Sequence, residues 1–296
     1  DNISQRGMSR ERINMIRLCA FADEAAKELA GQLRIMKENG IYLLELRSID
    51  GINVAKMSRA QAADYKAEID NAGVSVFSIG SPLGKADISC DFEEYKKTIA
   101  HVYDLAEIFG AENVRVFSFF NAYGNAEEVV SRLQYMADAG RARGLNICHE
   151  NEKEIFGDTL SRVQYLQSRV KGLKYIYDPA NFIQCGEKAA DTLSALAADA
   201  FYFHIKDVIA ATGELVPAGE GDGDIAGLVG GIKGDKVLTL EPHLRIFSGY
   251  GEIDNAEMKN KRAFRSNEEA FAAAAAALKK ILADCGYREK GGSYGK

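Results

Sequence analysis

Three carboxylates and one imidazole each close a separate apolar segment in the second half of the chain. They are Glu150 in LNICHEN, Asp178 in LKYIYDPAN, His204 in FYFHIKD and Glu241 in VLTLEPH. Hard oxygen and nitrogen ligands of this kind suit Mn²⁺, Mg²⁺, Co²⁺ or Zn²⁺. The residue types therefore predict a divalent metal site formed by Glu150, Asp178, His204 and Glu241.

The spacing of these residues indicates which elements must position them. Successive members are 28, 26 and 37 residues apart, and each interval has room for one helix and a returning strand. Ligands spaced in this way converge only if successive parallel strands end on the same side of a sheet or barrel. In a parallel barrel that side is the C-terminal mouth, where active sites lie.

Other polar residues should share the mouth, because side chains two positions apart on a strand point to the same face. Lys206 follows His204 at this spacing, His243 follows Glu241, and an earlier strand carries a similar charged pair. We expect four residues to bind a polar, hydroxyl-rich ligand: Lys206, His243, Glu45 and Arg47.

Short β-branched or aromatic segments alternate with longer amphipathic ones along the whole chain. The predicted strands cover 16–21, 42–47, 74–79, 113–119, 145–150, 174–178, 201–205 and 237–241. The predicted helices cover 25–39, 58–71, 92–109, 126–143, 159–170, 189–198, 225–232 and 268–285. Eight βα units predict an α/β fold, a single-domain (β/α)₈ TIM barrel. A doubly wound open sheet is the alternative, but it would not collect ligands from four consecutive strands.

The two ends of the chain differ from the barrel in composition. Residues 1–14 are polar and lack the apolar stretch of a secretory signal, so we expect a disordered or expression-derived leader. The barrel should span 15–287, and the glycine-rich residues 288–296 should form a flexible tail. We expect the GEGDG segment at 219–223 to be a mobile loop at the mouth, with Asp207 as a loop or cap residue.

Composition narrows the partners. The chain has 37 basic and 43 acidic residues and a pI near 5.4, which argues against a nucleic-acid partner. No apolar run approaches the roughly 18 residues that span a bilayer. Five scattered cysteines without a CxxC pair indicate reduced thiols, so we expect a cytoplasmic protein.

The motifs HEN at 149–151, YDPAN at 177–181, HIKD at 204–207 and LEPH at 240–243 resemble those of the sugar isomerase/epimerase superfamily of xylose isomerase-like barrels. The resemblance runs over about the whole barrel. It implies one divalent ion, Mn²⁺ first, with Co²⁺, Mg²⁺ or Zn²⁺ as alternatives. It also implies that Glu150 and Glu241 lie on opposite faces of a bound sugar and move protons through a metal-stabilised enediolate. The expected activity is that of a sugar or keto-sugar isomerase or epimerase.

Two features leave the reaction open. Asn181, which we expect to bind substrate, stands where the endonucleases and many ketose 3-epimerases of the superfamily carry a histidine, and residues 1–100 contain no histidine. A three-zinc nuclease is therefore disfavoured.

His149 is a further catalytic candidate. Its side chain faces the helix layer if its strand continues, and the substrate if the strand has ended. The alternative is a dehydratase-type or C-glycoside-cleaving lyase that acts on an oxidised sugar. We expect a homo-oligomer, or a hetero-oligomer in the lyase case.

Overall fold

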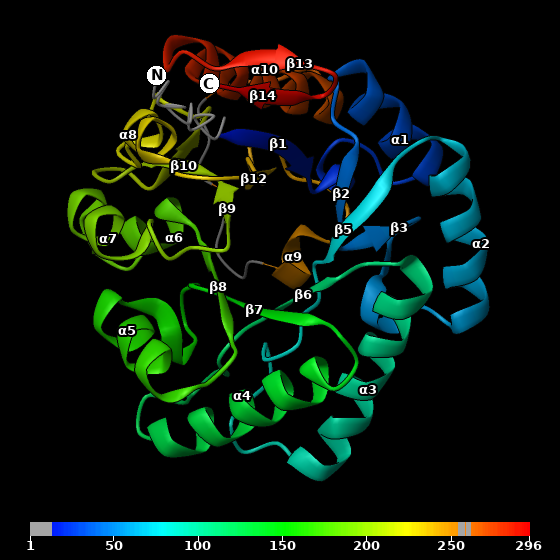
Figure 1. Cartoon of the computed structure of the whole chain (residues 1–296), viewed down its shortest axis with the longest axis vertical. Helices are drawn as coiled ribbons and strands as arrows, with labels where there is room; N and C mark the ends of the chain where they lie inside the picture. The colour runs from blue at the N-terminus through cyan, green and yellow to red at the C-terminus, as the bar shows by residue number, and fades with distance from the viewer. Residues whose placement is uncertain (1–13, 254–257, 259–261) are drawn as a thin grey trace, which may run out of the picture.

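Eight parallel strands close into a barrel in the computed structural model, which describes residues 14–253, 258 and 262–296. Figure 1 shows the ring of strands inside a ring of helices. β12 pairs with β1 and closes the ring, with Ile16 opposite Lys236 and Ala20 opposite Leu240. The barrel strands are β1 (Met15–Ala20), β2 (Leu43–Leu46), β5 (Ser75–Ile79), β6 (Asn113–Val116), β7 (Asn146–Glu150), β8 (Lys174–Tyr177), β9 (Tyr202–Ile205) and β12 (Lys236–Leu240). The predicted (β/α)₈ barrel is confirmed.

The eight predicted helices are also present, with ends that differ by a few residues. They are α1 (Leu29–Glu38), α2 (Arg59–Asn71), α3 (Phe92–Phe109), α4 (Ala126–Arg141), α5 (Leu160–Arg169), α7 (Ala189–Leu196), α8 (Ile225–Gly231) and α10 (Asn267–Asp284). Local signals fix several ends. Ser58 and Gln61 form a capping box before α2, and Gly110 ends α3 in the left-handed conformation.

The interior of the barrel has its own small core beneath the mouth. Cys19, Cys148, Ile176, Tyr202 and Val237 form a buried cluster there, separate from the large core that joins strands to helices. The hydroxyl of Tyr202 donates to Glu45 Oε1 at 2.7 Å. The apolar interior of the barrel therefore ends at a polar layer that includes Glu45, and the mouth lies directly above this layer.

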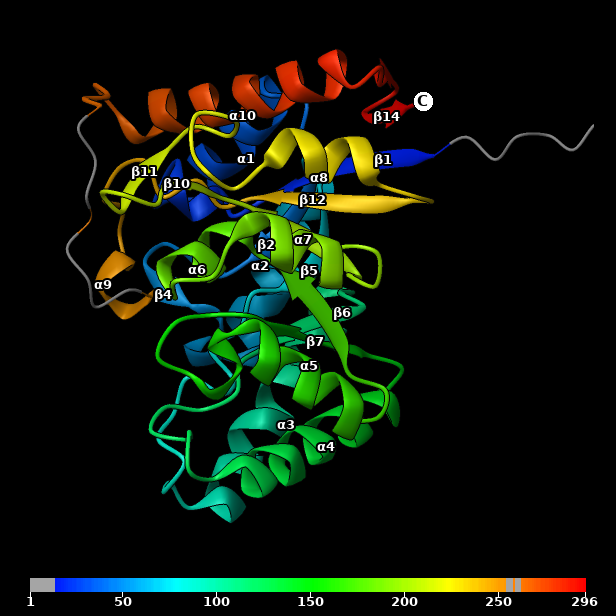
Figure 2. The ribbon, with the colours of Figure 1, turned by 90° about the vertical axis from the view of Figure 1, so that its left-hand side faces the viewer.

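Several short elements lie at the end of the barrel where the strands finish. They are the hairpins β3–β4 (Ser48–Ile49, Ile52–Asn53) and β10–β11 (Asp207–Ile209, Glu214–Val216), and the helices α6 (Pro179–Gln184) and α9 (Tyr250–Ile253). Figure 2 shows α9 and both hairpins at this end. Within the described part of the chain, no helix has both the length and the apolar character needed to cross a membrane.

The C-terminal residues differ from the prediction. Instead of a flexible tail, β13 (Arg288–Lys290) and β14 (Ser293–Gly295) form a hairpin, and β14 pairs antiparallel with the start of β1. Tyr294 lies opposite Ile16 and is buried, so this segment has an apolar anchor. Residues 1–13, which make up nearly all of the predicted leader, lie outside the described residues.

Candidate metal centre

The four predicted ligands come together at the mouth. Donor atoms of Glu150, Asp178, His204 and Glu241 all lie within 4.8 Å of one another, and each residue is at most 2% exposed. Glu150 ends β7 and His204 lies in β9, whereas Asp178 and Glu241 directly follow β8 and β12. The parallel register of these strands places the four side chains at one level of the barrel.

Cationic groups lie among the carboxylates. His204 Nδ1 is 2.9 Å from Glu150 Oε1 and 3.2 Å from Glu241 Oε2. Lys206 Nζ is 3.0 Å from Asp178 Oδ2 and 3.7 Å from Glu241 Oε2. The arrangement brings three carboxylates to one point, where their negative charges require a positive partner.

The donor atoms fit a bound cation. Asp178 Oδ2 and Glu241 Oε2 are buried carboxylate oxygens whose neighbours are positively charged nitrogens, Lys206 Nζ at 3.0 and 3.7 Å and, for Glu241, His204 Nδ1 at 3.2 Å. Burial raises the pKa of Asp178, although Lys206 opposes the shift. Burial alone would lower the pKa of His204, but Glu150 and Glu45 raise it well above its ordinary value. A divalent ion would satisfy both oxygens and replace the proton on the imidazole.

Glu45 orients the imidazole rather than facing the open mouth. Its Oε2 lies 3.1 Å from His204 Nε2, and its Oε1 accepts from Tyr202 and from Ser78. Metal-binding histidines commonly hold their second ring nitrogen against a carboxylate in this way. The contact leaves Nδ1 of His204 directed at the other ligands. Glu45 is as buried as the four ligand candidates, and its expected contact with a substrate stays a prediction.

Two buried arginines support the two glutamates, and the sequence had indicated only one of them. Arg47 donates to Glu241 Oε1 at 3.0 Å, as expected for a residue at the mouth. Arg115, in the middle of β6, donates to Glu150 Oε2 at 3.1 Å and to the carbonyl of Gly80. A charged side chain inside the apolar run NVRVF was the signal that could have identified it.

A second group that could hold a metal consists of Glu24, Glu241 and His243. Glu24 Oε2 accepts from the backbone N–H of His243 at 2.8 Å, and His243 Nε2 lies 3.3 Å from Glu24 Oε1. Arg47 already bridges this group, because its Nη1 is 3.0 Å from Glu241 Oε1 and its Nη2 is 3.3 Å from Glu24 Oε1. Because the guanidinium supplies the positive charge here, the four-residue group is the better cation site. Sequence reasoning missed Glu24, which ends the short 3-10 helix η1 (Ala22–Glu24) after β1.

The remaining predicted residues fall on both sides of the strands. Asn181 lies at the site, where its Nδ2 donates to Asn151 O at 2.9 Å and to Glu150 Oε1 at 3.3 Å. His149 lies on the other face of β7. Its ring packs against Tyr175, and a Cβ on Gly157 would come within 2.5 Å of its Cε1. Burial lowers the pKa of His149 to about 3. Of the two orientations predicted for His149, the structure has the one that faces the helix layer.

The GEGDG segment is anchored by a buried carboxylate. Asp207 accepts backbone N–H groups from Gly219, Gly221 and Gly223 at 2.8–3.1 Å, and from Val208 at 2.9 Å. Asp207 therefore holds the loop against the β10–β11 hairpin. This differs from our expectation of a mobile loop, since its backbone donors converge on one side chain.

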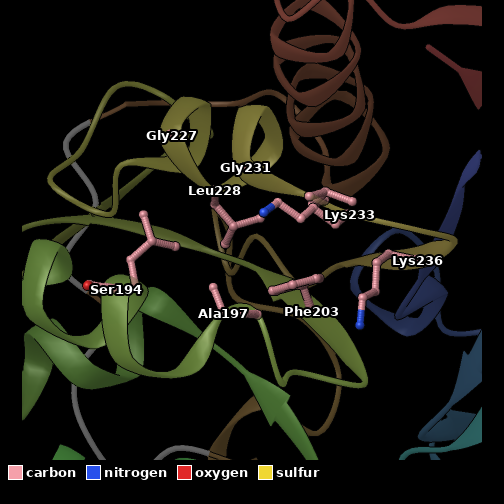
Figure 3. Close-up of a pocket in the computed structure, with 11 residues that line it drawn as sticks. Ser194, Ala197, Phe203, Gly227, Leu228, Gly231, Lys233 and Lys236 are labelled. Carbon is pink, nitrogen blue, oxygen red and sulfur yellow. The ribbon is translucent and has the colours of Figure 1, made fainter. Parts of the chain in front are cut away.

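A hollow of about 340 Å³ lies away from this centre, between α7 and α8 (Figure 3). Phe203 lines it from β9, Leu228 lines it from α8, and Lys233 and Lys236 lie at one side. None of the four ligand candidates lines this hollow. Its lining is mainly apolar and lacks carboxylates, so it does not compete for the metal.

Residues 33–281 match the family of xylose isomerase-like TIM barrels. The chain belongs to this family. No curated protein matches the sequence. Solved structures of xylose isomerase-like barrels and related enzymes share the fold at low sequence identity. They include the probable 3-DHS dehydratase AsbF from Bacillus anthracis (TM-score 0.65, 16% identity, covering 89% of this chain and 98% of that one).

Two further structures have similar scores. D-psicose 3-epimerase from Clostridium cellulolyticum H10, solved with D-tagatose, has a TM-score of 0.66 at 16% identity, covering 90% of this chain and 99% of that one. The IOLI protein, solved with a zinc atom, has a TM-score of 0.67 at 16% identity, covering 90% and 98%. Within the family, identities this low establish the common barrel alone.

Proposed function

We propose that the protein is a divalent-metal-dependent isomerase or epimerase, which moves a proton at a carbon beside the carbonyl group of a small sugar or keto-sugar. The observation that carries this proposal is the position of two glutamates. Glu150 and Glu241 approach Nδ1 of His204 from strands separated by β8 and β9, at 2.9 and 3.2 Å. Two carboxylates that reach one point from different sides can serve the two faces of a small substrate.

The residues of the centre suit this chemistry. Glu150, Asp178, His204 and Glu241 would hold the ion, which as a Lewis acid would polarise a carbonyl or hydroxyl oxygen. Arg115 and Arg47 keep Glu150 and Glu241 in fixed positions. Oxygen ligands with one imidazole favour Mn²⁺, with Co²⁺, Mg²⁺ and Zn²⁺ as alternatives.

The buried charges of the mouth favour an uncharged substrate. Most of the largely buried charged side chains there are carboxylates, and burial raises the pKa of one of them, Glu24, to about 8. A phosphorylated sugar would add a further negative charge beside these carboxylates. The carboxylates are Asp23, Glu24, Glu45, Glu150, Glu152, Asp178 and Glu241, and the cations are Arg47, Lys85, Arg115 and Lys206. A neutral sugar or keto-sugar is therefore the substrate class we propose.

The similar solved structures support a reaction of this kind. One is a sugar epimerase, one is a probable dehydratase, and one holds a zinc atom. Epimerisation and dehydration of a carbonyl compound can both begin with removal of a proton beside the carbonyl. The shared step is the part of the proposal that these structures support most directly.

A lyase that eliminates water or an aglycone from an oxidised sugar is the second candidate. His243 favours it, because its Nε2 lies 3.6 Å from Glu241 Oε1 and burial lowers its pKa well below the ordinary value, so that the neutral ring could accept the proton that an elimination removes. The backbone of His243 is in the left-handed region, with φ of 47°, and Glu24 holds its N–H. This places a third proton-carrying group beside the two glutamates.

Exchange in D₂O tests the proposal and separates the two candidates. The Mn²⁺-loaded protein is incubated with ketoses and with keto-sugars, and products are followed by NMR and mass spectrometry. Deuterium at one stereocentre with the carbon skeleton intact supports an isomerase or epimerase. Loss of water or of an aglycone supports the lyase. Elimination without any epimerised product would overturn the first choice.

Matched variants show whether the exchange belongs to this centre. Glu150→Gln and Glu241→Gln should each lower the exchange rate by about 10²-fold or more, the usual contribution of a general acid or base. Glu68→Gln, on the exposed face of α2, is the control and should retain the parent rate. Equal rates in all three variants would show that the two glutamates do not move the proton.

The cysteines agree with a cytoplasmic location. All five are free, and Cys19 and Cys148 are buried in the barrel interior. Unpaired thiols are typical of reducing compartments. We propose the cytoplasm as the place where the enzyme acts, which fractionation of cells that express it would test.

A further inference from the structure

We propose that the ammonium group of Lys206 takes the place of the cation when the centre is free of metal, and that an incoming divalent ion must displace it toward Glu152. This inference rests on the proposed metal site. Besides the four ligands that would bind the ion, it identifies a residue that competes with the ion for their oxygens. It also gives Lys206 two positions, one for each state of the centre.

The position of Lys206 is the first observation. Its Nζ is 3.0 Å from Asp178 Oδ2 and 3.7 Å from Glu241 Oε2. These oxygens belong to two of the four proposed ligands, and both are buried. The ammonium therefore lies beside the atoms that a divalent ion would need. Because both groups are positive, they repel each other strongly at such distances in a buried site.

The second observation is that the other two cations beside the ligands, Arg47 and Arg115, are held by aromatic rings and further hydrogen bonds. Arg47 lies 4.4 Å from the centre of the Phe21 ring and makes two hydrogen bonds to Asp23. Arg115 lies 4.9 Å from the Phe117 ring and donates to the carbonyl of Gly80. Both guanidinium groups are thus fixed from several sides.

Lys206 has no such support. Among the described residues, its recorded partners are carboxylates, with no stacked ring and no backbone carbonyl. A lysine side chain has four rotatable carbon–carbon bonds and a point charge, so it can change partners without moving the backbone. Of the three buried cations beside the ligands, Lys206 is the one that can leave.

A further carboxylate also acts on the charge of Lys206. Glu152 interacts electrostatically with Lys206 and is itself 3.2 Å from Lys85. Glu152 lies two residues beyond Glu150 and is almost fully buried. An ammonium that leaves Asp178 can therefore remain paired, which avoids an isolated buried charge.

Metal titration of the full chain tests the inference. Mn²⁺ binding to the parent, Lys206→Met and Lys66→Met is measured by calorimetry after removal of metal with a chelator. Lys66, which pairs with Asp70 on the surface of α2, is the control. Loss of the competing charge should make Lys206→Met bind Mn²⁺ at least about tenfold more tightly than the parent. Lys66→Met should match the parent.

Thermal unfolding gives a second readout. Lys206→Met should lower the unfolding temperature of the metal-free protein, because the carboxylates lose their internal cation. The difference from the parent should shrink when Mn²⁺ is saturating. Lys206→Gln, which keeps a polar side chain, replaces Lys206→Met in both measurements if the methionine variant does not fold.

The results separate this inference from the metal site itself. If the parent binds Mn²⁺ and removal of Lys206 leaves the affinity unchanged or weaker, the displacement is wrong and the metal site stands. Equal losses of stability with and without Mn²⁺ would also overturn it. If the parent binds no divalent ion, the metal site and this inference fail together.

Discussion

The carboxylate of Glu45 lies 3.1 Å from Nε2 of His204, while Nδ1 of the same ring faces Glu150 and Glu241. The imidazole is thus held from below by one carboxylate and directed at two others. A ring fixed in this way presents one nitrogen to a metal ion without rotating. The contact joins the apolar filling of the barrel to the candidate metal centre, because Glu45 also accepts from Tyr202.

We predict that Glu45→Gln weakens Mn²⁺ binding by about 10- to 100-fold, the usual effect of losing such an outer partner. The amide has one acceptor oxygen in place of two, so it cannot serve His204 and Tyr202 equally well. Calorimetric titration with Mn²⁺ measures the change, with Glu68→Gln on the surface of α2 as the control. An affinity equal to that of the parent would show that Glu45 does not orient the ring.

The buried ion pair of Arg47 should be important for stability. We predict that Arg47→Met lowers the free energy of unfolding by about 3–5 kcal/mol, because it leaves buried carboxylates without a partner. Urea unfolding measures this value. Arg34→Met removes a surface cation that pairs with Glu38 and should change little. Similar losses in the two variants would contradict the buried role of Arg47.

The loop at 219–223 should depend on Asp207. We predict that Asp207→Asn lowers the free energy of unfolding by about 1–3 kcal/mol, since one amide oxygen cannot replace a carboxylate that accepts four N–H groups. Gly221→Ala should act similarly, because its Cβ would lie 2.3 Å from Asp207 Oδ1. Urea unfolding and limited proteolysis of this loop measure the two effects. Asp64→Asn, on the surface of α2, is the control, and a loss of equal size there would contradict the role of Asp207.

Metal binding should strengthen as the pH rises. In the metal-free protein, burial raises the pKa of Asp178, and neighbouring carboxylates raise that of His204 above its ordinary value near 6.5. The imidazole therefore holds a proton that the ion must displace, and Asp178 takes one up as the pH falls below about 7, so a higher pH favours the ion. We expect Mn²⁺ affinity to increase steadily from pH 6 to pH 8, with proton release visible by calorimetry in buffers of different ionisation enthalpy. An affinity that falls over this range would contradict the assigned ligands.

The ligands could be predicted from the sequence because Glu150, Asp178, His204 and Glu241 each close an apolar strand, and parallel strands finish at one end of a barrel. Arg115 was missed because it lies inside a strand, where its orientation depends on the register with neighbouring strands. Glu24 lies in a 3-10 helix of three residues, which is too short to show a periodic signal.

Some features depend on contacts between distant segments. The C-terminal hairpin is ordered because Tyr294 pairs with Ile16, more than 270 residues earlier in the chain. The role of Asp207 requires glycines 12 to 16 residues away to fold back on its carboxylate. Neither contact follows from the helix or strand propensities of the residues near it, so the sequence alone could not predict them.

The most direct test of the metal centre is an anomalous diffraction measurement on crystals of the Mn²⁺-loaded protein. We predict one strong peak per chain, bounded by Glu150, Asp178, His204 and Glu241, and its loss in His204→Ala. A peak between Glu24, Glu241 and His243, or the absence of a peak in this part of the barrel, would contradict the account.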